Sequence, residues 1–306
     1  MRGKLLIITG PTAVGKTDCS IGLALECGSP VISADSRQIY REMRIGTAVP
    51  DASQLAAVKH YFIQTVPVTQ PYNAGQYEID ALDTIGKLFA EGHQTLVMSG
   101  GSGFYVDAVC NGLDCIPDAD PELREELTAR VRNEGVAALA EELRRTDPES
   151  WAAIDINNGQ RVVRALEVFK LTGRPFISYK LQAPKRRDFD IVKICLTRPR
   201  EELYDRINRR VLKMIDDGLV DEVRSLIPYR DSPALQTVGY REIFDYLDGK
   251  TSLDEAIRLI QRNTRHYARK QITWWKRDRS VKWVDLSSYA GNGFLEFLSR
   301  AEHPAL

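Results

Sequence analysis

The octapeptide GPTAVGKT at residues 10–17 constrains the fold of this chain more than any other stretch. It matches the phosphate-binding pattern G-x-x-x-x-G-K-[ST] at every fixed position. The apolar run at residues 5–8 predicts a buried parallel strand before it, and the residues after Lys16 predict a helix. In such a strand–loop–helix unit, backbone N–H groups and the helix N-terminus bind an anion, Lys16 contacts phosphate oxygens, and Thr17 can ligate Mg²⁺.

The loop alone leaves its chemistry open. A nucleotide that is hydrolysed, a phosphoryl group that is transferred and a diphosphate that leaves intact all fit the same backbone geometry. The 306 residues suffice for one large domain or two ordinary ones, and a content of 43% apolar and 27% charged residues is that of an ordinary folded protein. Neither a signal peptide nor a run of membrane-spanning length is apparent, so we expect a cytoplasmic protein without a membrane partner.

Strand and helix patterns alternate along the chain, which predicts a doubly wound α/β fold. Residues 115–188 differ, because they are rich in charge, helical in pattern and without a convincing strand. We therefore expect a P-loop-type parallel sheet core with a helical insertion. The predicted strands are residues 4–9, 30–34, 95–99 and 191–196, and the predicted domains are residues 1–114 (first part of the core), 115–188 (helical insertion) and 189–306 (completion of the core and basic C-terminal helices).

A row of four arginines near the C-terminus is unusual for a chain whose formal net charge is zero. Arg258, Arg262, Arg265 and Arg269 are spaced i, i+4, i+7, i+11, so they share one helical face. Like charges at this spacing repel one another by a few tenths of a kcal/mol per pair, which an anionic polymer would offset. The row predicts binding to a phosphate backbone, with a plain solvated face as the alternative.

Two further loops follow predicted strands at the sheet edge where parallel folds hold their ligands. Asp35-Ser36-Arg37-Gln38 follows residues 30–34, and a glycine loop with Ser102 follows residues 95–99. From the residues alone, an acid beside a phosphate loop is a Mg²⁺ ligand or a group that orients water, and the glycines suit a tight turn.

Six motifs in order resemble the tRNA dimethylallyltransferases, also called tRNA isopentenyltransferases. They are GPTAVGKT, SADSRQIYREMRIGTAVP, SGGSGFY, GQRVVRALEVF, TVGYREIFDYLDG and RKQITWW, and they cover residues 10 to about 283. DSRQIY and RKQITW are the specific blocks, because ordinary P-loop kinases share neither. One departure is Ser102, where the family more often has Thr; the hydroxyl is retained.

The resemblance implies a P-loop core that carries a helical insertion and a defined reaction. Members transfer a dimethylallyl group from dimethylallyl diphosphate to N6 of adenine 37, next to the anticodon of tRNA, with Mg²⁺. Asp35 matches the general base, while Lys16, Mg²⁺ on Thr17 and Arg210 would stabilise the diphosphate that leaves whole. The implied diphosphate-binding residues are Gly10, Pro11, Thr12, Ala13, Val14, Gly15, Lys16 and Thr17.

The same motif matches imply the contacts with the tRNA anticodon stem and loop, made by an enzyme that we expect to be a monomer. Arg124, Arg161 and Arg164 would otherwise form ordinary salt bridges on helix surfaces. The implied tRNA-binding residues are Asp35, Ser36, Arg37, Gln38, Ser102, Arg124, Gln160, Arg161, Val162, Val163, Arg164, Gln236, Thr237, Val238, Gly239, Tyr240 and Arg241.

Three alternative functions remain at this stage. A P-loop nucleoside or metabolite kinase would use the DRINRR segment as an arginine lid and would consume ATP. A prenyltransferase acting on free adenine nucleotides would not need the basic C-terminal row. A non-catalytic RNA-binding switch would tolerate the loss of the Asp35 carboxylate.

Overall fold

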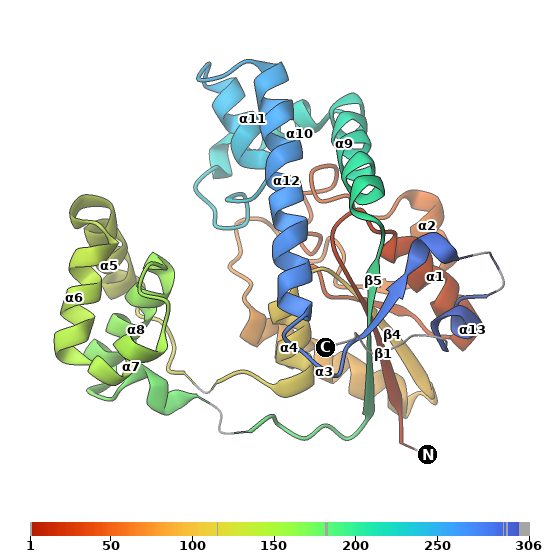
Figure 1. Cartoon of the computed structure of the whole chain (residues 1–306), viewed down its shortest axis with the longest axis horizontal. Helices are drawn as coiled ribbons and strands as arrows, with labels where there is room; N and C mark the ends of the chain where they lie inside the picture. Colours follow the sequence, from red (N-terminus) through yellow and green to blue (C-terminus); the bar gives the residue numbers. More distant parts are fainter. Residues whose placement is uncertain (1, 115, 181–182, 290, 292, 300–306) are drawn as a thin grey trace. The chain divides into compact units, whose positions relative to one another are not determined.

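Six parallel strands form one sheet in the order β3-β2-β4-β1-β5-β6 (Figure 1). The computed structural model describes residues 2–114, 116–180, 183–289, 291 and 293–299. β1 and β4 are predominantly apolar because neighbours cover both edges and both faces of a central parallel strand. The strands are β1 (Lys4–Thr9), β2 (Val31–Ser33), β3 (His60–Tyr61), β4 (Thr95–Ser99), β5 (Asp190–Thr197) and β6 (Lys282–Asp285).

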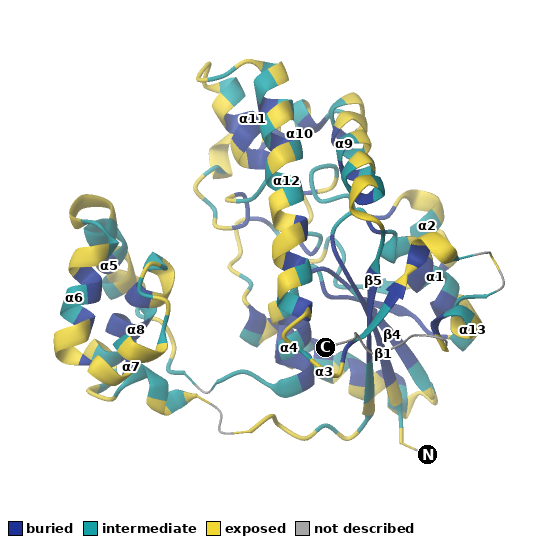
Figure 2. Ribbon diagram, viewed as in Figure 1, coloured by how far each residue is buried: buried dark blue, intermediate teal, exposed yellow. Residues whose placement is uncertain are grey.

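The chain divides into two units, Met1–Asn111 with Arg186–Leu306, and Gly112–Lys185. The larger unit holds the sheet, whose strands are buried while its helices keep an exposed outer face (Figure 2). Its helices are α1 (Lys16–Cys27), α2 (Ala52–Ala57), α3 (Ala74–Ala90), α4 (Gly103–Asn111), α9 (Arg200–Asp216), α10 (Leu219–Ser225), α11 (Tyr240–Leu247), α12 (Leu253–Trp275) and α13 (Phe294–Ser299).

The smaller unit is all helical in its described residues and has its own apolar core. Leu127, Leu139, Leu143 and Leu166 are fully buried there. Its helices are α5 (Pro121–Glu134), α6 (Val136–Thr146), α7 (Pro148–Ala153) and α8 (Gly159–Thr172). The prediction of a parallel P-loop-type sheet with a helical insertion is confirmed; of the predicted range 115–188, residues 115, 181 and 182 lie outside the described residues.

Helix α12 carries the predicted arginine row. Ser252 caps its N-terminus by accepting a hydrogen bond from the Glu255 N–H. Ala256, Ile260, Ala268 and Trp275 are buried, so one face of the helix packs against the larger unit. Its 23 residues span about 35 Å at 1.5 Å per residue. Among the described helices, none is both long and apolar enough to cross a membrane.

Candidate active site

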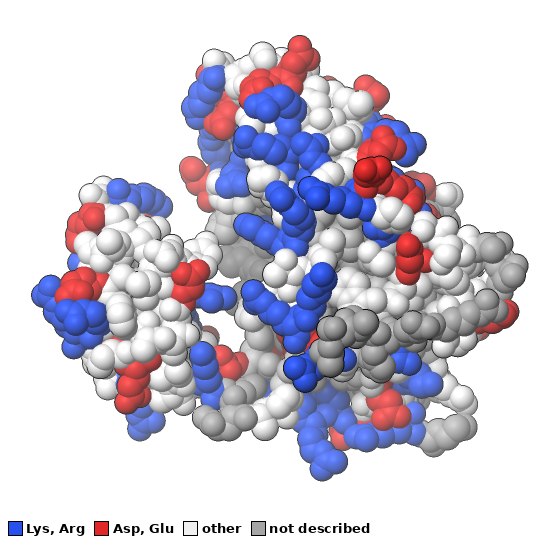
Figure 3. Space-filling model, in the orientation of Figure 1, with Lys and Arg blue, Asp and Glu red and all other residues white. Residues whose placement is uncertain are grey.

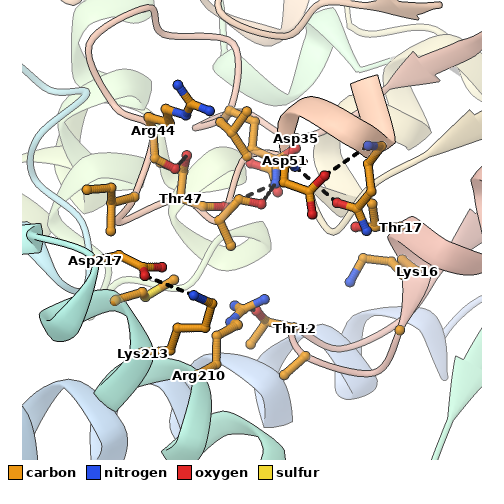
Figure 4. A pocket seen from close by; sticks show the side chains of 18 of the residues that line it. Thr12, Lys16, Thr17, Asp35, Arg44, Thr47, Asp51, Arg210, Lys213 and Asp217 are labelled. Atoms are coloured by element: carbon orange, nitrogen blue, oxygen red, sulfur yellow. Dashed lines mark hydrogen bonds and ion pairs between the residues drawn. The ribbon is translucent and has the colours of Figure 1, made fainter. Parts of the chain in front are cut away.

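A cavity of about 950 Å³ opens in the larger unit, at the carboxyl ends of β1 and β2. Parallel sheets commonly bind ligands at this edge. Residues of the phosphate loop, the segment after β2, the 44–49 loop and α9 line the cavity. In Figure 4, Arg44 and Thr47 lie across the cavity from Arg210 and Lys213 of α9, with Lys16 at one end.

The phosphate loop has the backbone shape of an anion site. Gly10, Ala13 and Gly15 have φ values of 141°, 66° and 112°, a left-handed region that favours glycine. A Cβ on Gly10 would lie 2.5 Å from the Leu196 carbonyl oxygen, so only glycine fits against β5. Gly15 is the N-cap of α1 and has no side chain to bond the first N–H groups of that helix, which leaves them for an anion.

Three arginines hold the phosphate loop from the side of β5 and α9. Arg206 donates from Nε to the Ala13 carbonyl oxygen at 2.8 Å, and Arg198 donates from Nε to the Val14 carbonyl oxygen at 2.8 Å. Arg210 bonds the Thr12 hydroxyl. Of the three, the family motif implied a role at the diphosphate for Arg210 alone. Arg206 lies one helical turn before it on the same face of α9, and this spacing is visible in the sequence.

Gln271 joins two loops that are distant in sequence. Its Oε1 accepts from the Thr12 N–H at 2.8 Å, and its Nε2 donates to the Gly101 carbonyl oxygen at 2.9 Å. A Cβ on Gly101 would approach Nε2 to 2.3 Å, so a side chain there would displace the amide. Gln271 belongs to the RKQITW block, whose part in the site the sequence analysis missed.

Lys16 lies across the phosphate loop and faces the cavity. Its Nζ donates to the carbonyl oxygens of Gly10 at 3.0 Å and Pro11 at 2.9 Å. Burial first, and the positive charge of Arg210 second, lower the pKa of Lys16 to about 8, while the Asp35 carboxylate acts in the opposite direction. A bound anion would raise the pKa of Lys16 again and so favour its protonated form.

We expect binding of an alkyl diphosphate to weaken above pH 8, because the free protein then loses the Lys16 charge. Since the bound anion favours the protonated amine, binding should take up close to one proton, and Kd should rise about tenfold per pH unit. The ionisation of the diphosphate itself is complete by roughly pH 7, so it does not interfere. Calorimetry in buffers of different ionisation enthalpy measures both quantities. Lys16→Arg should give a flat profile from pH 7 to 9.5; a flat wild-type profile would contradict the prediction.

Asp35 lies in the segment after β2 and lines the same cavity as Lys16. Its Oδ1 accepts from the backbone N–H groups of Arg37 at 2.9 Å and Gln38 at 3.3 Å, which fixes the carboxylate in a local turn. The Asp35 charge also counters the lowering of the pKa of Arg210 that burial causes. A carboxylate and two cations therefore share one enclosed space.

Ser102 connects the glycine loop to the segment after β2. Its Oγ accepts from the Ser36 N–H at 2.8 Å and bonds the Ser36 hydroxyl at 3.0 Å. The two loops are also in backbone contact, since a Cβ on Gly100 would lie 2.1 Å from the Ala34 carbonyl oxygen.

The side chains of Arg37 and Gln38 support neighbouring loops. Arg37 donates from Nη1 to the carbonyl oxygens of Pro233 at 3.1 Å and Ala234 at 3.0 Å. Gln38 donates from Nε2 to those of Thr47 at 3.1 Å and Ala48 at 3.0 Å. Gln38 also lines the cavity, so its side chain both holds the 44–49 loop and forms part of the cavity wall.

The predicted tRNA-binding residues of the larger unit split into two groups. Gln236 and Arg241 are exposed, and Thr237 and Val238 are half-buried. Tyr240 is 0% exposed, and its hydroxyl donates to Glu222 Oε1 at 2.6 Å. Tyr240 is therefore a core residue, and the prediction that its side chain contacts tRNA is wrong. Gly239 is also buried; it precedes α11 as its N-cap.

In the smaller unit, Val162 and Val163 are 0% and 6% exposed and pack into the helical core, so the prediction that these side chains contact tRNA is wrong too. Gln160 and Arg161 are exposed on α8.

Arg124 and Arg164 share the fully buried Glu167. Each bonds Glu167 Oε2 at 2.6 Å, and Arg164 also bonds the Pro117 carbonyl oxygen at 2.5 Å. Glu167 thus holds both guanidinium groups, whose side chains stay 45% and 23% exposed. A buried carboxylate between two cations fixes their direction. It leaves part of each guanidinium accessible to an anion.

The arginine row of α12 is mostly exposed. Arg262 and Arg269 are exposed, and Arg258 is exposed but bonded to Glu255 at 2.6 Å. Arg265 is half-buried, and its Nη1 donates to Asn208 Oδ1 at 2.6 Å. Figure 3 shows Lys and Arg gathered over the face of the larger unit along which α12 runs.

Known proteins match this chain over most of its length. A family model described as IPP transferase matches residues 38–278. The tRNA dimethylallyltransferase 1 of Bacteroides thetaiotaomicron is 48% identical over 279 residues, which are 91% of this chain and 90% of that protein. A tRNA dimethylallyltransferase 2 of Porphyromonas gingivalis is 50% identical over 279 residues, with coverages of 91% and 93%.

The crystal structure of a tRNA isopentenylpyrophosphate transferase from Bacillus halodurans has a TM-score of 0.71 at 39% identity and covers 96% of this chain and 94% of its own. Sequence and fold thus agree over nearly the whole chain. The cavity residues from Gln38 onward fall within the region that the family model matches, and the phosphate loop and Asp35 precede it. On these matches, the chain belongs to the IPP transferase family of enzymes.

Proposed function

We propose that this enzyme transfers a dimethylallyl group from dimethylallyl diphosphate to N6 of adenine 37 in tRNA and releases diphosphate. The observation that carries the proposal is the cavity itself, whose lining includes both an anion-binding loop and the Asp35 carboxylate. The named relatives of the chain, which are tRNA dimethylallyltransferases, support the same reaction.

The donor diphosphate would occupy the phosphate loop. The first N–H groups of α1, the Lys16 ammonium and the Arg210 guanidinium all lie there. As the bond from carbon to the diphosphate oxygen breaks, negative charge grows on the diphosphate, and these groups stabilise it where it forms. Because the leaving group departs intact, no step needs ATP.

Part of the cavity lining suits a short hydrocarbon. Ile45, Ala48, Val49 and Met214 contribute aliphatic carbon to it, among the charged and polar residues of the same lining. Burying apolar carbon is worth about 25 cal/mol per Å², so contact with these side chains would stabilise an alkyl group.

Asp35 would act as the general base. The N6 amine of adenine is a poor nucleophile because its lone pair is delocalised into the ring. As the new C–N bond forms, the amine proton moves to the Asp35 carboxylate, while the electron pair of the breaking C–O bond leaves with diphosphate. General bases of this kind contribute about 10² to 10⁴ in rate.

Mg²⁺ fits the donor set around the loop. Thr17 offers a hydroxyl, and Asp18 and Asp35 place carboxylates on the same cavity. The described residues hold no cluster of three metal-ligating side chains, but Mg²⁺ commonly uses only one or two protein oxygens and completes its shell with phosphate and water. When bound, the ion would neutralise charge on the leaving diphosphate, with Thr17 as its ligand on the chain.

The exposed arginines of α12 would bind the tRNA backbone, so we expect Arg262→Gln with Arg269→Gln to weaken tRNA binding and leave donor affinity unchanged. The slope of log K against log salt should fall by about 0.7 to 0.9 per lost contact. Lys87→Gln on α3 is the control, because Lys87 is exposed but paired with Asp83. Binding isotherms at several salt concentrations, with a melting curve for each variant, measure the effect; an unchanged slope would remove α12 from the interface.

Mass spectrometry of nucleosides tests the whole proposal. After incubation of unmodified tRNA with the enzyme, dimethylallyl diphosphate and Mg²⁺, digestion should release N6-dimethylallyladenosine, and diphosphate should appear in equal amount without ATP. Prenylation of free AMP in preference to tRNA would establish the free-nucleotide alternative. Phosphoryl transfer from ATP with no prenylated product would establish the kinase.

A further inference from the structure

The 44–49 loop forms one wall of the cavity and is held at two places: Gln38 bonds its end at Thr47 and Ala48, and a carboxylate of α10 bonds its start. The loop supplies Arg44, Ile45, Thr47 and Ala48 to the lining, opposite α9. Ala48 has a φ of 53°, a left-handed conformation that alanine rarely adopts. A loop with such a residue keeps its shape only where bonds from outside over-determine it.

Glu222 of α10 supplies those bonds. Its Oε2 accepts from the backbone N–H groups of Arg44 at 3.0 Å and Ile45 at 2.7 Å. Its Oε1 accepts from the Gly46 N–H at 3.0 Å and from the Tyr240 hydroxyl at 2.6 Å. Four donors from two distant segments thus converge on one ionised group, and each is a charge-assisted hydrogen bond.

Tyr240 completes the arrangement by packing against the loop. A Cβ on Gly46 would lie 2.6 Å from Cε2 of Tyr240, so the loop contacts the ring at the one residue of the loop without a side chain. Burial, and then the Glu222 charge, raise the pKa of Tyr240, which keeps its hydroxyl a donor. The ring and the carboxylate therefore both contact the loop at Gly46.

The position of Glu222 links the two walls of the cavity. α10 follows α9 directly through Gly218, and α9 carries Arg210 and Met214 on the cavity lining. Because Glu222 bonds the opposite loop, the spacing between Met214 on one wall and Ile45 on the other depends on this carboxylate. Those two side chains are part of the apolar lining that would hold the donor's hydrocarbon group.

We propose that Glu222 and Tyr240 are positioning residues that hold the 44–49 loop against α9 and so set the length of prenyl chain that the cavity accepts. Within the TVGYRE motif, Tyr240 would then help to shape the donor pocket, independently of what the exposed residues of the motif contact. This inference rests on the proposed function, since it assigns a selectivity to the donor site.

Three variants test it. Tyr240→Phe keeps the ring and removes one donor, and Glu222→Gln places an amide N–H₂ against backbone donors. The control is Glu242→Gln, a carboxylate that is 6% exposed and bonds the Gly239 N–H at 2.8 Å and Asn263 at 2.7 Å, away from the loop. Steady-state kinetics with dimethylallyl diphosphate and with ten-carbon geranyl diphosphate gives donor KM, tRNA KM and chain-length preference for each.

We expect Glu222→Gln to raise donor KM by about tenfold and to lower the preference for the five-carbon donor by about tenfold, with tRNA KM within twofold of wild type. Tyr240→Phe should show part of each effect. The variant with both substitutions should change donor KM and preference by less than the sum of the two single effects, because both substitutions act through the Glu222 carboxylate. Glu242→Gln should leave the preference unchanged even where it lowers the melting temperature. Unchanged donor KM and preference in Glu222→Gln, or a rise in tRNA KM instead, would overturn the inference.

Hydrogen exchange of the free protein separates this inference from the proposed function. The amides of Arg44, Ile45 and Gly46 should exchange about tenfold faster in Glu222→Gln than in wild type and no faster in Glu242→Gln. This readout needs no substrate. If the wild type transfers no prenyl group while these amides respond as expected, the proposed function is wrong, but the role of Glu222 in holding the loop is supported. If transfer occurs and the amides do not respond, Glu222 does not hold the loop and the inference is wrong.

Discussion

Asp35→Asn should lower turnover by about 10² or more while tRNA affinity stays within a few fold. The substitution keeps an oxygen that accepts from the Arg37 and Gln38 N–H groups, so the local turn survives. What it removes is the capacity to take a proton from the adenine amine. Single-turnover rates at saturating donor and tRNA measure the chemical step, and filter binding measures tRNA affinity.

Asp51→Asn is the matched control, because Asp51 also lines the cavity but serves as the N-cap of α2 through the Gln54 N–H. Asparagine caps helices as well as aspartate does, so turnover should change by less than a few fold. Equal losses in the two variants would assign the effect to the charge of the cavity. A turnover of Asp35→Asn close to wild type would exclude Asp35 as the base.

Lys16→Ala should reduce kcat/KM for the donor by about 10² to 10³, through both kcat and KM. In the proposed reaction, the ammonium contacts the diphosphate before reaction and stabilises it more strongly as negative charge accumulates. Its loss should therefore raise the donor KM and lower kcat. Initial rates at varied dimethylallyl diphosphate give the two constants, and tRNA binding should not change.

Lys213→Ala provides the comparison on the same cavity, since Lys213 is exposed and paired with Asp217 at 2.8 Å. An exposed, paired lysine contributes little, and we expect less than a threefold change. If Lys16→Ala retained the donor kcat/KM of the wild type, or if Lys213→Ala lowered kcat/KM as much as Lys16→Ala does, the phosphate loop would not be the donor site.

The sequence predicted the centre of the fold well and its edges poorly. β1 and β4 were predicted at the residues observed, because strands buried on both faces are short apolar runs. β3 and β6 were missed. His60 and Tyr61, and Lys282 to Asp285, are edge strands whose polar residues face solvent on one side, and no run of two to four such residues differs from a loop in sequence.

The site shows a similar division. Motif spacing predicted the phosphate loop and the segment after β2, since both consist of residues adjacent in sequence. It could not predict Gln271 or Glu222, whose roles depend on partners about 170 to 260 residues away. It also assigned Val162, Val163 and Tyr240 to the RNA surface, because a motif match identifies residues but not which side of a helix faces the core.

The place of the helical unit within the chain has a consequence for synthesis on the ribosome. β1 pairs with β4 on one edge and with β5 on the other, yet β5 is made roughly ninety residues after β4, which is about 5 to 20 s at ordinary elongation rates. During that interval β1 has an unpaired apolar edge, while residues 112–185 emerge with a core of their own and can fold at once. The nascent chain is therefore most prone to aggregation in this window, and substitutions that slow folding of the inserted helices should lower the yield of active enzyme more than they lower the stability of the finished protein.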